Sequence, residues 1–505
     1  MDKYIARSRR IELQQRRLNQ KIEESCRRSG HGRPMTRRGF LGSGLISGLG
    51  MVFMPSLASM LTQQAFAAEC VIDVDPALGA GKIPFISIDQ GGGANIAGSN
   101  ILVGTQGQED FLTAEGYAKL GLPNAIIPQN VGVDRTFGIA MHPSSAMLRG
   151  MLNKTTLATQ VGTNGVVIPA RSENDTGDNP HNPVYGIAKA GASGEFVAAI
   201  GSRNSNTGGR SAAPDYMIDP ALRPTKVSNS NEAIGLGGGE QDGFPNNSVA
   251  EASKIISALK LGKITAEQAT KDLVQCGYDK THATFNTPIS TADLDPNQDA
   301  LLQQIFPGNE LNEGDYRKAA AVMKTVISGY AGAGTIEYGG RDYHQDPRSE
   351  TDQKDFIIGQ VIGASLEYAQ LSNKPLMVYV FSDGAVSAGG QEDDDGNGVS
   401  KYRWKSDNSQ TAASAIFVYQ PGGVRPALRA EVANTNQLGT YRESGNVETA
   451  SSPFANNVTS LAEMVVLNYL ALHNQQSMFG AQVLPNNGLG TGVAVDPYIA
   501  FEPIV

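Results

Sequence analysis

Asp342 and His344 are the residues of this chain whose types and spacing are best suited to chemistry. They are separated by one residue on a loop that follows a short β-prone run, residues 335–338, and Asp383 comes directly after a later apolar run. A carboxylate and an imidazole this close in the chain can reach the same divalent cation. The pattern therefore predicts a metal site built from residues just past the ends of strands.

The segment around these residues predicts a strand, a helix and a second strand. Apolar residues recur at helical spacing after Asp352, which can serve as the N-cap, and Asn373 and Pro375 stop the helix. Residues 376–381, LMVYVF, are apolar without alternation, which is typical of a strand buried on both faces of a parallel sheet. Open α/β sheets place their ligands at the carboxyl ends of strands, so one sheet edge would hold the candidate ligands.

Other apolar runs extend this interpretation. Further strands are expected over 83–89, 157–161, 196–200 and 415–419, and helices over 145–152, 248–275 and 461–472. The 58 Gly and 25 Pro of the 505 residues indicate long loops. The predicted fold class is α/β, with a mostly parallel central sheet covered by helices on both faces.

Several polar residues remain as alternatives. Asp89 ends the first expected strand, before Gln90 and three glycines, and is either a ligand or a turn-forming residue. The loop 171–181 carries acidic residues and a histidine that suit either a cation or water. Residues 393–398 fit the first half of a calcium loop, but Trp404 stands where the bidentate Glu belongs, so a solvated acidic turn is the alternative.

The charge distribution limits the kinds of partner that this protein is expected to bind. The formal net charge is −9, yet residues 1–67 contain 12 of the 41 Lys and Arg and only 4 of the 50 Asp and Glu. The rest of the chain is therefore strongly acidic. Binding to nucleic acid needs clustered Lys and Arg that neutralise phosphates, so this composition argues against a nucleic-acid partner.

The first 67 residues read as a targeting segment. A basic region ends in Thr36-Arg37-Arg38-Gly39-Phe40-Leu41, followed by a Gly-rich apolar run and the small-x-small site Ala65-Phe66-Ala67. This segment resembles a twin-arginine export signal, which implies the twin-arginine translocase as a partner and a periplasmic or secreted protein that meets the membrane only through the signal. An uncleaved anchor is the alternative. Cys70 and Cys276 would then form a disulfide or remain as two thiols.

Residues 68–505 are expected to form a single domain with loop insertions at about 202–250 and 388–410. The order of its motifs over roughly residues 83–425 resembles the bacterial family called domain of unknown function 1501, which is related to the alkaline phosphatase and sulfatase superfamily. The late motifs of that family, W-D-T-H, S-E-F-G-R and D-H-G, correspond to residues 341–344, 382–385 and 407–409. Asn408 stands where a His is common, and Glu173 replaces the His of R-S-H.

The resemblance implies an alkaline-phosphatase-like fold and a metal-dependent hydrolase of phosphate or sulfate esters. Arg341 would hold an oxyanion, or else pair with Glu337. The metal ligands that it implies are Asp89, Asp342, His344, Asp383 and Asp407. Oxygen ligands in place of two histidines favour calcium, magnesium or manganese over zinc. The alternative is a catalytically inactive member of the fold that acts as an envelope or secretion-associated binding or structural protein.

Overall fold

A computed structural model describes residues 81–505, apart from 175, 237–254 and 256–290. The expected export signal, both Cys70 and Cys276, and nearly all of the segment 248–275 lie outside the described residues. The chain divides into Met1–Val52 and Phe53–Val505, and the described residues all belong to the second unit. Among them, no helix is both long enough and apolar enough to span a bilayer.

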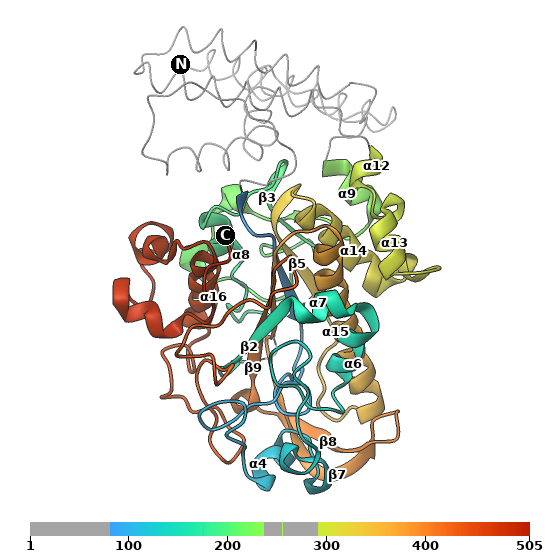
Figure 1. The fold of residues 1–505 in the computed structure, drawn as a ribbon, viewed down its shortest axis with the longest axis vertical. Helices are drawn as coiled ribbons and strands as arrows, with labels where there is room; N and C mark the ends of the chain where they lie inside the picture. The colour runs from blue at the N-terminus through green and yellow to red at the C-terminus, as the bar shows by residue number, and fades with distance from the viewer. Residues whose placement is uncertain (1–80, 175, 237–254, 256–290) are drawn as a thin grey trace, which may run out of the picture. The chain divides into compact units, whose positions relative to one another are not determined.

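A seven-stranded sheet forms the centre of the described fold, in the order β2-β9-β6-β1-β5-β3-β4 (Figure 1). Strand β9 runs antiparallel to its neighbours β2 and β6, and every other neighbouring pair is parallel. The strands are β1 (Phe85–Gln90), β2 (Thr163–Pro169), β3 (Val197–Gly201), β4 (Thr225–Lys226), β5 (Ala331–Tyr338), β6 (Leu376–Ser382) and β9 (Ala413–Tyr419). The predicted α/β class with a mostly parallel sheet is confirmed.

Helices cover both faces of this sheet (Figure 1). On one face, Ile86 and Ile88 of β1 lie in a core with α14 (Gly314–Ile327), α15 (Arg348–Leu371) and α6 (Ala146–Lys154). On the other face, Phe85 and Phe381 lie in a core with α8 (Val184–Lys189) and α16 (Val458–Leu472). Successive strand residues point to opposite faces, so a central strand that is apolar at every position can fill both cores.

The other described elements are short. A separate two-stranded antiparallel ribbon of β7 (Val386–Asp394) and β8 (Ser400–Asp407) occupies much of the expected insertion at 388–410. The short helices are α4 (Ala114–Lys119), α5 (Pro128–Val131), α7 (Leu157–Val161), α9 (Ser230–Leu236), α12 (Thr291–Leu294) and α13 (Ala300–Ile305). Short 3₁₀ segments and loops connect them.

The predicted strand over 157–161 is wrong, because these residues form helix α7 and strand β2 begins only after Gly162. Leu157 is 72% exposed, so it is not the core residue that the apolar pattern suggests. Thr159 instead donates a hydrogen bond to Glu367 of α15 at 2.6 Å, which ties the helical turn to α15. The β-branched residues Val166, Val167 and Ile168 supply the buried strand a few residues later.

The predicted start of the long helix at Asp352 is also wrong. Helix α15 begins at Arg348, directly after Pro347, and Asp352 lies within it. The Asp352 carboxylate is buried, lies 2.9 Å from the Arg348 guanidinium and accepts a hydrogen bond from Lys401 of β8. A carboxylate that a sequence pattern assigns to a cap is used here to neutralise two buried cations.

The acidic run that resembles half of a calcium loop forms the turn of the β7–β8 ribbon. Asp394 accepts a hydrogen bond from Gly396 N, and Asp395 accepts from Asn397 N and Val399 N. Asp395 is buried and lies 3.5 Å from Lys401 Nζ. These two carboxylates are therefore engaged by the turn itself and by a buried lysine, as expected of Asx-type turns.

Candidate metal centre

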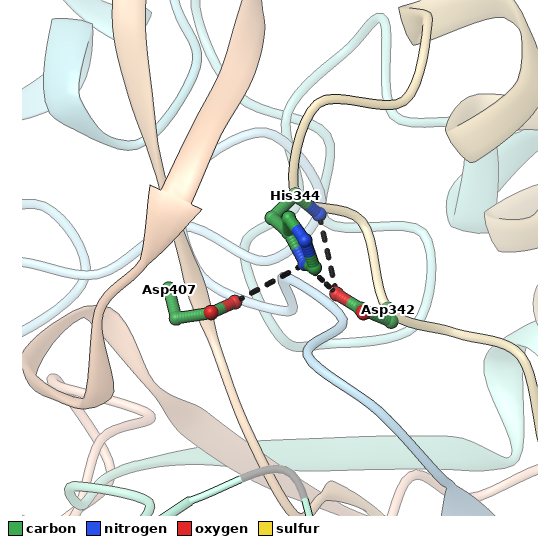
Figure 2. A group of neighbouring side chains, drawn as sticks. All are labelled: Asp342, His344 and Asp407. Carbon is green, nitrogen blue, oxygen red and sulfur yellow. Dashed lines mark hydrogen bonds and ion pairs between the residues drawn. The ribbon is translucent and has the colours of Figure 1, made fainter.

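Asp342, His344 and Asp407 form a cluster of three candidate metal ligands at one edge of the sheet (Figure 2). One ligand atom from each residue lies within 4.8 Å of the other two. The His344 Nδ1 atom contacts Asp342 Oδ1 and lies 3.5 Å from Asp407 Oδ1. The side chains of Asp342 and His344 are both 39% exposed, so a cation from solvent can reach the cluster.

Two loops that pair beyond the ends of β1 and β5 position the first two ligands. Gly91 O accepts a hydrogen bond from Arg341 N at 3.0 Å, and Gly93 O accepts one from Tyr343 N at 3.3 Å. The parallel ladder between the two strands therefore continues into the loops. Asp342 and His344 are thereby placed at the carboxyl edge of the sheet, where α/β proteins bind their ligands.

The β7–β8 ribbon brings the third ligand. Asp407 is the last residue of β8 and pairs with Val386, the first residue of β7. Asn408 N donates to Ala385 O at 2.7 Å, which fixes the backbone just beyond Asp407. Because β7 follows β6 after a short turn, the ribbon carries Asp407 back to the edge at which Asp342 and His344 lie.

Gly92 permits the closest approach between these loops. Its φ is +131°, and a Cβ atom built on it would lie 2.6 Å from the carbonyl carbon of Arg341 and still closer to Asp342 N. A side chain at position 92 would push against the backbone that carries the first ligand. The glycine-rich loop thus serves here for close packing of two backbones.

Two carboxylates and one imidazole can hold a divalent ion. This ligand set fits zinc or manganese better than magnesium or calcium, because imidazole is a common ligand of transition metals whereas magnesium and calcium prefer oxygen ligands. Three protein ligands leave coordination positions for water or substrate, as catalytic metal sites require. Among the described residues, this is the one group of three or more His, Cys, Asp or Glu side chains whose ligand atoms lie close enough together to hold a metal ion.

Asp89, a further predicted ligand, is engaged elsewhere. It is fully buried and accepts three hydrogen bonds, from Arg210 N at 2.7 Å, Ser211 N at 2.8 Å and Ser211 Oγ at 2.9 Å. Burial raises the pKa of Asp89 to about 6, although these bonds act to lower it. The loop after β3 therefore occupies the carboxylate, and Asp89 is outside the three-residue cluster.

Asp383, also predicted as a ligand, is fully buried beside the Gly92 backbone. Its Oδ1 atom accepts a hydrogen bond from Gly92 N at 2.6 Å, and its Oδ2 atom lies 3.6 Å from Arg210 Nε. Burial raises the pKa of Asp383 to about 7. The same glycine thus donates its N–H group to Asp383 and leaves room, through its missing side chain, for the backbone of Asp342, yet Asp383 is not part of the cluster.

Arg341, the predicted oxyanion-binding residue, is buried, with 5% of its surface exposed, and packs against an aromatic ring. Its guanidinium carbon lies 5.3 Å from the centroid of the Tyr338 ring. The alternative partner, Glu337, pairs instead with Arg203 at 3.0 Å. Arg341 therefore makes a cation–π contact that stabilises the end of β5.

Asn408 and Glu173, which stand where the resembled family commonly has histidines, have other surroundings in the structure. Asn408 accepts a hydrogen bond from Gln410 N at 3.1 Å and so forms a turn. Glu173 is exposed.

His181, in the same loop as Glu173, is buried and stacks on Phe381, with 5.8 Å between ring centroids. Burial lowers the pKa of His181 to about 3, and its ring nitrogens have no hydrogen-bond partner within the described residues.

Sequence reasoning missed three residues that shape this edge, namely Gly92, Arg210 and Tyr343. Arg210 lies in a Ser- and Gly-rich loop that has no catalytic pattern. Only the three glycines after Gln90 offered a signal, since glycine permits the close approach of another backbone. A scan against protein-family models and a search of curated proteins gave no match to this chain. Fold and site together define the class as an α/β protein with a candidate three-ligand metal centre at the carboxyl edge of its sheet.

Proposed function

We propose that this protein binds one divalent metal ion through Asp342, His344 and Asp407. The observation that supports it is the convergence of an imidazole nitrogen and two carboxylate oxygens within 4.8 Å of one another. The three ligands come from two separate parts of the fold, so chain adjacency alone does not explain the cluster. Their partial exposure leaves the ion accessible to a substrate.

For the reaction, we propose hydrolysis of small phosphate or sulfate esters on an alkaline-phosphatase-like fold. A divalent ion with open positions would supply a bound water of lowered pKa and polarise the ester oxygen. The protein's own contribution is to fix the three ligands and to keep their outer side open to solvent. Export through a twin-arginine signal remains part of this proposal and rests on residues 36–41.

A second candidate is a catalytically inactive envelope or secretion-associated protein of the same fold. The hydrogen bonding of Asp89 favours it, because three donors already occupy a carboxylate that the family resemblance assigns to the metal. The packing of Arg341 against Tyr338 favours it as well, since the guanidinium that the family resemblance assigns to an oxyanion makes a cation–π contact. In this case the ion would stabilise the edge or join a partner protein.

The test is elemental analysis of protein purified without chelators, combined with a screen of phosphate and sulfate esters. We expect about one equivalent of metal in the wild type, little in Asp342→Ala/His344→Ala, and a full equivalent in Asp346→Ala, which alters an acidic residue of the same loop that pairs with Lys354. Turnover that a chelator abolishes supports the hydrolase. Bound metal without turnover supports the inactive candidate, and equal metal in all three proteins overturns the site.

A further inference from the structure

Tyr343 lies between the two ligands Asp342 and His344, and its side chain is fully buried. Its hydroxyl donates a hydrogen bond to Asp355 Oδ1 at 2.7 Å. Asp355 belongs to helix α15 and is itself 1% exposed. The residue between the two ligands is thus hydrogen-bonded, through its buried side chain, to the longest described helix.

Asp355 is held in place from its other side. Its Oδ2 atom accepts a hydrogen bond from Asn100 Nδ2 at 2.7 Å. Asn100 Oδ1 in turn accepts from Ser145 Oγ at 2.9 Å and from Met147 N at 3.3 Å, at the start of α6. Both carboxylate oxygens of Asp355 are therefore occupied, and a continuous buried network links α6, α15 and the ligand loop.

The Tyr343 ring also contacts the part of the fold that supplies the third ligand. It packs in a small buried cluster with Ala94, Val386 and Trp404. Val386 is the strand partner of Asp407, and Trp404 belongs to β8, whose last residue is Asp407. One side chain therefore touches the glycine-rich loop and the ribbon, and its own backbone carries the other two ligands.

We propose that Tyr343, through its hydrogen bond to Asp355, is a positioning residue that fixes the three metal ligands before an ion binds. This inference rests on the metal centre proposed above. A ligand set held in place in the metal-free protein loses little conformational freedom on binding, so its affinity is higher than that of a loose set. Buried partners behind metal ligands act in this way in other proteins.

The test compares Tyr343→Phe with Tyr469→Phe. Tyr469 is also fully buried and donates one hydrogen bond, to Ile83 O at 2.8 Å, but it lies in the core on the opposite face of the sheet. Both variants lose one buried hydroxyl, so we expect the melting temperature of both metal-free proteins to decrease. Calorimetric titration with Mn²⁺ should show affinity at least about tenfold weaker in Tyr343→Phe and unchanged in Tyr469→Phe.

Asp355→Leu provides a second route if Tyr343→Phe fails to fold, since it removes the acceptor of the same hydrogen bond. We expect it to weaken Mn²⁺ binding as Tyr343→Phe does, and the double variant to be no weaker than either single variant. Wild-type affinity in Tyr343→Phe or Asp355→Leu would overturn the positioning role and leave the metal centre intact. If the wild type itself binds no Mn²⁺, the metal centre and the positioning role both fail.

Discussion

His344 Nδ1 lies 3.5 Å from Asp407 Oδ1, a residue that the chain reaches only after helix α15, strand β6 and the β7–β8 ribbon. The contact joins the loop after β5 to the end of β8 (Figure 2). The backbone beside each partner is paired separately, since Tyr343 N donates to Gly93 O and Asp407 pairs with Val386 in the ribbon. The candidate site is therefore a property of the assembled sheet edge.

Substituting Gly92 should disturb this edge more than substituting a glycine in open space. In Gly92→Ala, the new methyl group collides with the backbone at Arg341 and Asp342, so we expect a loss of stability of more than about 2 kcal/mol and weaker metal binding. Gly340→Ala is the control, because its φ is +71° but nothing lies within 4 Å of the added atom. Urea unfolding and Mn²⁺ titration measure both effects, and equal losses in the two variants would contradict the role of Gly92.

Removing Asp352 should be strongly destabilising. Its carboxylate neutralises both Arg348 and Lys401 in the buried region between α15 and β8, so Asp352→Ala leaves two buried cations without it. We expect a loss of about 3–5 kcal/mol in the free energy of unfolding. Asp346→Ala removes a partly exposed partner of Lys354 and should cost no more than about 1 kcal/mol. Similar denaturation midpoints would show that the buried pair contributes little.

His181 should make the protein sensitive to acid. Its pKa in the folded protein is about 3, whereas an unfolded histidine titrates near about 6.5. As the pH falls below 6.5, the unfolded chain binds a proton that the folded protein excludes, so stability decreases until the pH reaches the folded pKa. In His181→Leu this loss is absent. The variant should gain on the wild type by up to roughly 4 kcal/mol between pH 7 and pH 3.

Urea unfolding of both proteins at several pH values measures that difference. Asp383 has a raised pKa and contributes a pH dependence of the opposite sign, since its folded form retains a proton between about pH 4 and 7. It is present in both proteins, so it cancels in the comparison. A difference that stays constant with pH would contradict the assignment of a neutral, buried imidazole.

The proposed export signal can be tested with conservative changes. Replacing Arg37 and Arg38 together by Lys keeps the charge and should leave precursor in the cytoplasm, because the proposed signal depends on the arginine pair itself. The matched control replaces Arg27 and Arg28 by Lys, another adjacent pair in the same basic segment, and should be exported normally. Cell fractionation and the size of the product report the result. Normal export of the Arg37/Arg38 variant would refute the twin-arginine interpretation.

The buried strands were predictable because their residues are apolar at every position. Residues 376–381 and 415–419 are strands in the structure, and the helix expected over 145–152 is α6, with Ser145 as its N-cap. Residues 157–161 misled the pattern, because five residues with two exposed apolar ends can form a helical turn as readily as a strand. The N-cap prediction for Asp352 was also wrong, because Asp352 forms a buried ion pair with Lys401, a residue distant in the sequence.

By itself, the sequence determined that Asp342 and His344 share one loop at a strand end, because their proximity is local. The tertiary structure alone decided which other carboxylates join them. Asp407 does so because the β7–β8 ribbon returns to the same edge, whereas Asp89 and Asp383 are held apart by Ser211, Arg210 and Gly92. Hydrogen bonds from loops distant in the chain determine where each carboxylate points, and no spacing in the sequence encodes those contacts.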